Sequence, residues 1–64
     1  MLSHKFNIGD IVALKPAIKR NILGGIYQVT KQLPENQGEL EYCIKNPKEP
    51  YARVVREREL AKPQ

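Results

Sequence analysis

Apolar and polar residues alternate strictly over residues 39–45, where Leu40, Tyr42 and Ile44 take every second place. Side chains two positions apart on a β-strand point to the same face, so this stretch predicts a strand with one buried side. Three further segments are short, rich in Val, Ile, Leu and Tyr, and bounded by glycine or proline. The expected strands are residues 11–15, 26–33, 39–45 and 51–55.

Glycine and proline mark the connections between these strands. Residues 33–38 predict a hairpin connection in which Gly38 takes a positive φ, and residues 46–50 predict a second tight connection. Residues 16–24 predict a polar loop that is too interrupted for a helix of normal length. Residues 56–60 predict a single helical or 3-10 turn.

The number and length of the strands predict an all-β fold. We expect one domain over residues 1–64, with residues 1–5 frayed and residues 61–64 either frayed or forming a very short fifth strand. A small barrel of four to five antiparallel strands is favoured over an open sheet, because curling removes the exposed edges. The expected core takes one face of each strand: Val12, Leu14, Tyr27, Val29, Leu40, Tyr42, Ile44, Val54 and Leu60.

Four motifs carry a likeness to a known fold. They are Phe6-x-x-Gly9-Asp10-x-Val12, Gly25-x-Tyr27-x-Val29, Tyr42-x-Ile44-Lys45 and Arg53-Val54-Val55-x-Glu57-x-Glu59-Leu60. The chain resembles SH3-like barrels of the KOW and Tudor type. Over residues 5–60 it is similar to a family of short alphaproteobacterial proteins, whose pattern also includes Leu33-Pro34-Glu35, Gly38-Glu39 and Glu49-Pro50.

The resemblance implies a small SH3-like barrel and no particular activity, since one barrel fold serves many functions. Cys43 departs from the family pattern, in which a basic residue is expected. A groove for proline-rich peptides is not expected, because the chain has no tryptophan and only four aromatic residues.

Length and composition bear on the size of the core and on the expected cellular location. A chain of 64 residues has a thin core, and its single cysteine excludes an internal disulfide. No apolar stretch approaches the roughly 20 residues that a membrane-spanning helix needs, and the N-terminus lacks the apolar part of a signal peptide. A reducing cytoplasm is the expected location.

Catalysis and metal binding are not expected. His4 is the only histidine and is read as an exposed tail residue, and Cys43 has no base beside it. Asp10, which follows Gly9, is read as part of a turn. Three acidic residues are expected to be solvated rather than to bind a metal: Glu35, Glu39 and Glu41. We therefore expect no enzyme, no cofactor and no metal site.

Two binding hypotheses remain open. The net charge of +4 agrees either with simple solubility or with a polyanion such as RNA or DNA. The candidate nucleic-acid contacts are Lys15, Lys19, Arg20, Lys31, Arg53 and Arg56. Tyr51 is the one tyrosine expected at the surface, whereas Tyr27 and Tyr42 are assigned to the core.

The alternative is a protein-interaction module or a small homo-oligomer. Apolar residues gather around the loop and exceed what a thin core can bury: Ile18, Ile22, Leu23 and Ile26. The loop either exposes them as a contact site or folds them over the end of the barrel. Salt-sensitive binding of nucleic acid and salt-tolerant binding of a protein separate the two hypotheses.

Overall fold

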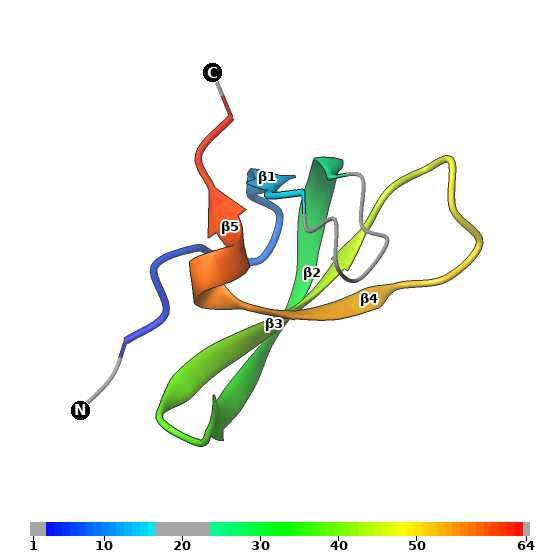
Figure 1. The fold of residues 1–64 in the computed structure, drawn as a ribbon. Helices are drawn as coiled ribbons and strands as arrows, with labels where there is room; N and C mark the ends of the chain where they lie inside the picture. Colours follow the sequence, from blue (N-terminus) through cyan, green and yellow to red (C-terminus); the bar gives the residue numbers. More distant parts are fainter. Residues whose placement is uncertain (1–2, 17–23, 64) are drawn as a thin grey trace.

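The computed structural model describes residues 3–16 and 24–63, and these residues form five strands and one 3-10 turn (Figure 1). The elements are β1 (Ile11–Leu14), β2 (Gly25–Asn36), β3 (Glu39–Lys45), β4 (Arg53–Arg56), the 3-10 turn η2 (Glu57–Glu59) and β5 (Leu60–Ala61). Neighbouring strands are antiparallel in the order β4-β3-β2-β1-β5. The predicted all-β class is confirmed, together with the turn before the last strand.

The sheet curls without closing. Its edge strands are β4 and β5, and the pairing found over the described part of the chain does not join them to each other. The three residues of η2 carry the chain directly from one edge to the other. The described residues therefore form a small curled sheet of five antiparallel strands that does not close into a barrel.

The curl comes mainly from β2, the longest strand. Its register against β3 shifts between Val29 and Lys31 and again between Leu33 and Asn36. An extra residue in one strand bends and twists the pair locally, which is how a single strand curves around a small core. The second shift contains Pro34, which has no N–H to give to a regular ladder.

The β2–β3 connection is tighter than predicted. The strands continue to Asn36 and resume at Glu39, so only Gln37 and Gly38 form the turn, both with positive φ (55° and 82°). The positive φ expected at Gly38 is confirmed. The polar residues near this hairpin end are thus part of the strands.

The core matches the predicted face of most strands. Its buried apolar residues are Phe6, Val12, Leu14, Tyr27, Val29, Leu40, Tyr42, Ile44, Val55 and Leu60. The prediction for β4 is wrong, because Val55 is 5% exposed whereas Val54 is 61% exposed. Val55 pairs with the inward Tyr42 and Val54 pairs with the outward Cys43, and paired residues share a face.

The N-terminal segment contacts the sheet and η2 at His4 and Lys5. His4 is half-buried rather than exposed, with its Nε2 at 2.8 Å from the carbonyl oxygen of Leu33 and its ring edge-on to Tyr42 at 5.0 Å. The main-chain N–H of Lys5 donates to the Glu57 carboxylate at 2.9 Å. The first residues of the described chain thus contact β2, β3 and η2.

Phe6 completes this attachment. Its ring lies edge-on to Tyr42, at 5.8 Å between centroids, and its carbonyl oxygen accepts a hydrogen bond of 2.8 Å from Gln32. Next to it, Asp10 accepts the main-chain N–H of Asn7 at 2.9 Å and donates its own N–H to the Asn7 carbonyl at 3.0 Å. The turn role predicted for Asp10 is confirmed.

In the part of the chain that the structure describes, no helix is long and apolar enough to cross a membrane.

Candidate functional site

The described candidate basic residues do not all lie on one face of the sheet. Lys19 and Arg20 lie outside the described residues, as do Ile18, Ile22 and Leu23 of the alternative site. Of the four remaining basic candidates, Lys31 and Arg56 pair with outward residues of β3, and Arg53 pairs with the inward Ile44. Lys15 follows the end of β1. Arg53 and Arg56 are both in ion pairs.

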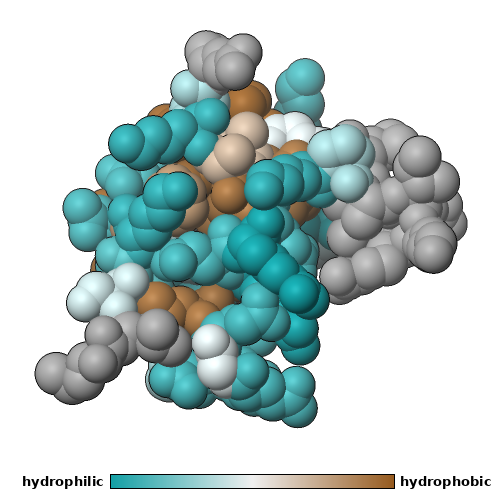
Figure 2. All heavy atoms as spheres, turned by 60° about the vertical axis from the view of Figure 1, so that its left-hand side comes forward, coloured by the Kyte–Doolittle hydropathy of each residue, from teal (hydrophilic) through white to brown (hydrophobic). Residues whose placement is uncertain are grey.

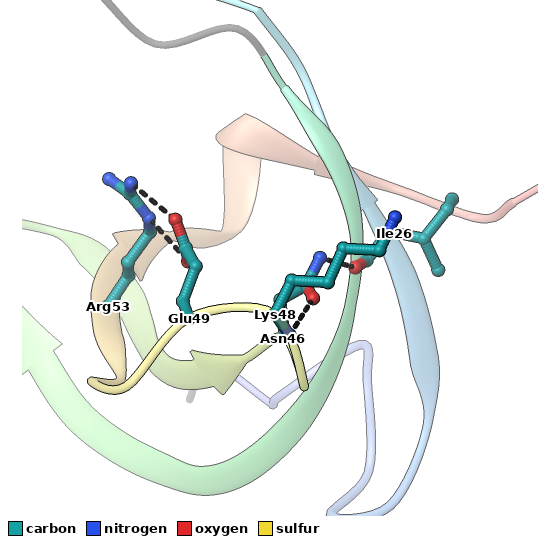
Figure 3. A network of polar contacts seen from close by, with 5 residues as sticks. All are labelled: Ile26, Asn46, Lys48, Glu49 and Arg53. Atoms are coloured by element: carbon teal, nitrogen blue, oxygen red, sulfur yellow. Dashed lines mark hydrogen bonds and ion pairs between the residues drawn. The ribbon is translucent and has the colours of Figure 1, made fainter.

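Arg53 is held by a carboxylate from the β3–β4 connection. Its Nε and terminal nitrogen donate to the two oxygens of Glu49 at 3.1 and 2.8 Å (Figure 3). The guanidinium also lies 5.5 Å from the ring centroid of Tyr51, which is exposed as predicted. The hydrogen bonds from Arg53 lower the pKa of Glu49, and those to Glu49 raise the pKa of Arg53. Most of the positive charge of Arg53 is therefore balanced locally.

Arg56 is paired in the same way at the hairpin end of the sheet. Its terminal nitrogen donates to Glu39 at 2.9 Å, and the Nε of Arg58 lies 3.2 Å from the other oxygen of Glu39. One carboxylate thus contacts two guanidinium groups. Glu39, one of the three acidic residues expected to be solvated, is thus held in ion pairs.

Lysines supply the uncompensated charge on the outer face of the sheet. Lys31 pairs in register with Cys43, and Lys45 lies two residues beyond Cys43 on the same face of β3. The register shift between Val29 and Lys31 lies between these two positions. Both side chains are exposed, and neither contacts a carboxylate within the described ranges.

Lys48 extends this set at one end. Asn46 accepts the main-chain N–H of Lys48 at 2.7 Å and donates to the carbonyl oxygen of Ile26 at 3.0 Å, so the connection after β3 is fixed against β2. The Lys48 side chain reaches toward Ile26 (Figure 3). We call Lys31, Lys45 and Lys48 the lysine face.

Exposed isoleucines border the lysine face. Ile11 and Ile26 are 50% and 51% exposed and lie diagonally across β1 and β2, where Ile11 pairs with Gln28 and Ile26 pairs with Ala13. Gln28 in turn pairs with Lys45, so one outer surface continues from lysine to isoleucine. Of the apolar residues expected around the loop, Ile26 lies within the described residues and is exposed.

A hollow of about 400 Å³ opens on another side of the molecule. The N-terminal segment, the end of β1, the β2–β3 turn and η2 surround it, and Leu40 and Leu60 contribute apolar walls. Figure 2 shows the side of the molecule that carries the N-terminal segment and η2, where apolar atoms are visible within a frame of hydrophilic ones. The charged groups in the lining are Lys5, Lys15, Glu39, Glu57 and Arg58.

Glu57 is part of the fold as well as of this lining. Its carboxylate accepts hydrogen bonds from the buried Tyr42 hydroxyl and from the main-chain N–H of Lys5. Burial alone would raise the pKa of Glu57, but the bonds from Tyr42 and Lys5 outweigh it and the pKa is lowered. Burial, and next the bond to Glu57, raise the pKa of the Tyr42 phenol. The lowered pKa favours the carboxylate form of Glu57 in the lining of the hollow.

No group of three or more His, Cys, Asp and Glu residues that could hold a metal occurs within residues 3–16 and 24–63. Cys43 lies on the outer face, half-buried, as the alternation of β3 predicted. Among these same residues, no buried side-chain nitrogen or oxygen lacks a hydrogen-bond partner.

Four basic residues at these two places were not among the candidates predicted from the sequence: Lys45 and Lys48 of the lysine face, and Lys5 and Arg58 of the hollow. For Lys45 a signal was present, because strict alternation in residues 39–45 already places it on the outward side.

Comparison of the chain with protein-family models, with curated proteins and with solved structures gave no match.

Proposed function

We propose that the chain is a non-catalytic binding module whose lysine face binds single-stranded nucleic acid by charge. The observation that carries the proposal is the separation of charges on β2–β4: Arg53 and Arg56 are paired with carboxylates, whereas Lys31 and Lys45 are exposed without one among the described residues. Unpaired ammonium groups are the ones available to phosphates.

The surroundings of the lysine face agree with binding that is weak and insensitive to sequence. Aromatic side chains that stack on bases are the usual partners of a basic groove, and here the exposed Tyr51 already lies against Arg53. Contacts from Lys31, Lys45 and Lys48 would therefore act mainly on the phosphate backbone. The single thiol fits a reducing compartment such as the cytoplasm. We also propose, from the motif likeness, membership of the family of short alphaproteobacterial proteins.

Salt dependence tests this function. Three phosphate contacts predict that the logarithm of the association constant for a single-stranded oligonucleotide falls with a slope of about −2 against the logarithm of salt concentration. Lys45→Ala should flatten the slope by about 0.7. Lys62→Ala removes the same charge from an exposed position after β5 and should leave the slope unchanged. Equal effects of the two substitutions, or no binding at low salt, would refute the proposal.

A second function is supported by the exposed pair Ile11 and Ile26, which fits a protein contact such as a small homo-oligomer. Apolar contacts tolerate salt, so sedimentation velocity at high ionic strength should show concentration-dependent association. Ile26→Gln should abolish it, whereas Val54→Gln changes a valine outside this pair that is 61% exposed against 51% for Ile26, and should not. A single slow species at every concentration would exclude the homo-oligomer.

A further inference from the structure

In the hollow beside η2, the acidic side chains are engaged within the protein to a greater degree than the basic ones, which the order of charges along the sequence does not show. Its lining contains two carboxylates, and both are occupied within the protein: Glu57 accepts from Tyr42 and Lys5, and Glu39 contacts Arg56 and Arg58. These two acidic groups therefore have little remaining capacity to attract a cation into the hollow.

The cations of the lining are occupied to a smaller degree. The Lys15 side chain contacts no carboxylate within the described part of the chain, and its main-chain N–H alone is engaged, with the Glu59 carbonyl at 2.9 Å. The Lys5 ammonium lies 5.6 Å from the Phe6 ring centroid, a contact that leaves its three N–H donors in place. Arg58 uses its Nε toward Glu39 and is 68% exposed. Three cationic side chains in the lining of the hollow therefore have N–H groups that can donate hydrogen bonds to a ligand.

The volume and the walls indicate the size of the ligand. About 400 Å³ lies within the range of small-molecule sites, and Leu40 and Leu60 supply apolar parts of the lining. A compact dianion suits two ammonium groups and one guanidinium better than a single carboxylate does, because each charge-assisted bond adds to the binding.

We propose that this hollow binds the phosphate group of a small molecule through Lys5, Lys15 and Arg58. The site is separate from the lysine face, since its walls include the inward residues Leu40 and Leu60 whereas Lys31 and Lys45 lie on the outer face of the sheet. The two sites can therefore be present or absent independently.

Titration of the ¹⁵N-labelled protein tests the proposal. Inorganic phosphate, added at constant ionic strength set with sodium chloride, should produce saturable shifts of the amide signals of Lys15, Gly38 and Arg58. Glycerol 3-phosphate should bind at the same amides, and the ratio of the two affinities distinguishes free phosphate from a phosphate ester as the ligand. Acetate should bind more weakly than either, and equal affinity for acetate would refute the assignment of a phosphate.

Substitutions locate the binding. Lys15→Ala should weaken phosphate binding by about tenfold, the usual effect of losing one bond to a charged group. Its fold should persist, because Lys15 contributes only its main chain to the hydrogen bond with Glu59. Lys5→Ala is a second variant of the same kind, whose bond to Glu57 also comes from the main chain.

Two controls keep this site apart from the lysine face. Lys62→Ala should leave phosphate affinity unchanged, and so should Lys45→Ala, the variant that weakens nucleic-acid binding. Shifts that grow linearly with phosphate, or an affinity unaffected by both Lys15→Ala and Lys5→Ala, would overturn the proposal. Failure of oligonucleotide binding alone would reject only the nucleic-acid function.

Discussion

Replacing Tyr42 with phenylalanine removes one oxygen atom from the contact that attaches the N-terminal segment. The Tyr42 side chain is fully buried, and its hydroxyl accepts the main-chain N–H of Phe6 at 3.1 Å while donating to the carboxylate of Glu57. The phenylalanine ring keeps the shape of the core. The variant therefore measures the hydroxyl group with little contribution from packing.

The size of the effect follows from the two bonds. A hydrogen bond to a charged group is worth about 1.5–3 kcal/mol, and a buried N–H left without a partner costs about 1–3 kcal/mol. Glu57 is half-buried and water replaces part of its lost bond, so we expect a loss of about 2–3 kcal/mol in the free energy of unfolding. That is a large fraction of the stability of a small domain.

Urea unfolding at pH 7 measures this loss. Tyr51→Phe is the matched control, because Tyr51 is 54% exposed and its ring contact with Arg53 survives the change. It should alter the free energy of unfolding by less than about 0.5 kcal/mol. A similarly small effect for Tyr42→Phe would show that the N-terminal segment is not held by this hydroxyl.

The pH dependence tests the same bond from the side of Glu57. Its lowered pKa means that the folded state favours the carboxylate, so this contribution is present above the unfolded pKa of about 4.3 and is lost as the pH falls through the folded pKa. The difference between the native protein and Tyr42→Phe should therefore shrink below about pH 4. Glu49, whose pKa is also lowered, is present in both proteins and does not contribute to the difference.

Two pairs of variants test the register and the turns. Val55→Ala should lower the free energy of unfolding by about 1–3 kcal/mol in urea, and Val54→Ala by less than about 0.5 kcal/mol; the reverse order would restore the predicted register. Gly24→Ala places a Cβ 2.7 Å from the Leu14 carbonyl at a φ of +84°, whereas Gly38→Ala meets only the cost of a φ of +82° in open space. Thermal unfolding should show a loss at least about 1 kcal/mol greater for Gly24→Ala, and equal losses would show that β1 yields at Leu14.

The sequence was sufficient to predict which residues of a strand are buried where apolar residues occupy only one of its two faces. The alternation over residues 39–45 has a single interpretation, and it places Leu40, Tyr42 and Ile44 inside as the structure does. Residues 53–56 read Arg-Val-Val-Arg, which is symmetric, so either valine can take the inner face. The choice is made by pairing with β3, a long-range contact that local pattern does not contain.

The candidate site was harder to predict for the same reason. A basic residue is available for a ligand only if no carboxylate neutralises it, and that depends on contacts between distant residues. Arg56 and Glu39 are 17 residues apart and meet only because β4 lies beside β3. Counting charges along the chain therefore assigned Arg56 to a basic surface, whereas the folded chain gives that role to lysines.

The attachment of the N-terminal segment bears both on the stability of this 64-residue chain and on the proposed phosphate site. A small domain buries a limited core, and the attachment of Phe6, which is 3% exposed and packs against Tyr42, adds to it. The attachment depends on Glu57, 52 residues away from Lys5. The carboxylate of Glu57 accepts hydrogen bonds from Tyr42 and from the main chain of Lys5, so the Lys5 ammonium interacts with Glu57 only through space and keeps its N–H donors. The contact that fastens the chain end thereby leaves a cation at the rim of the hollow, available to an anion from solution.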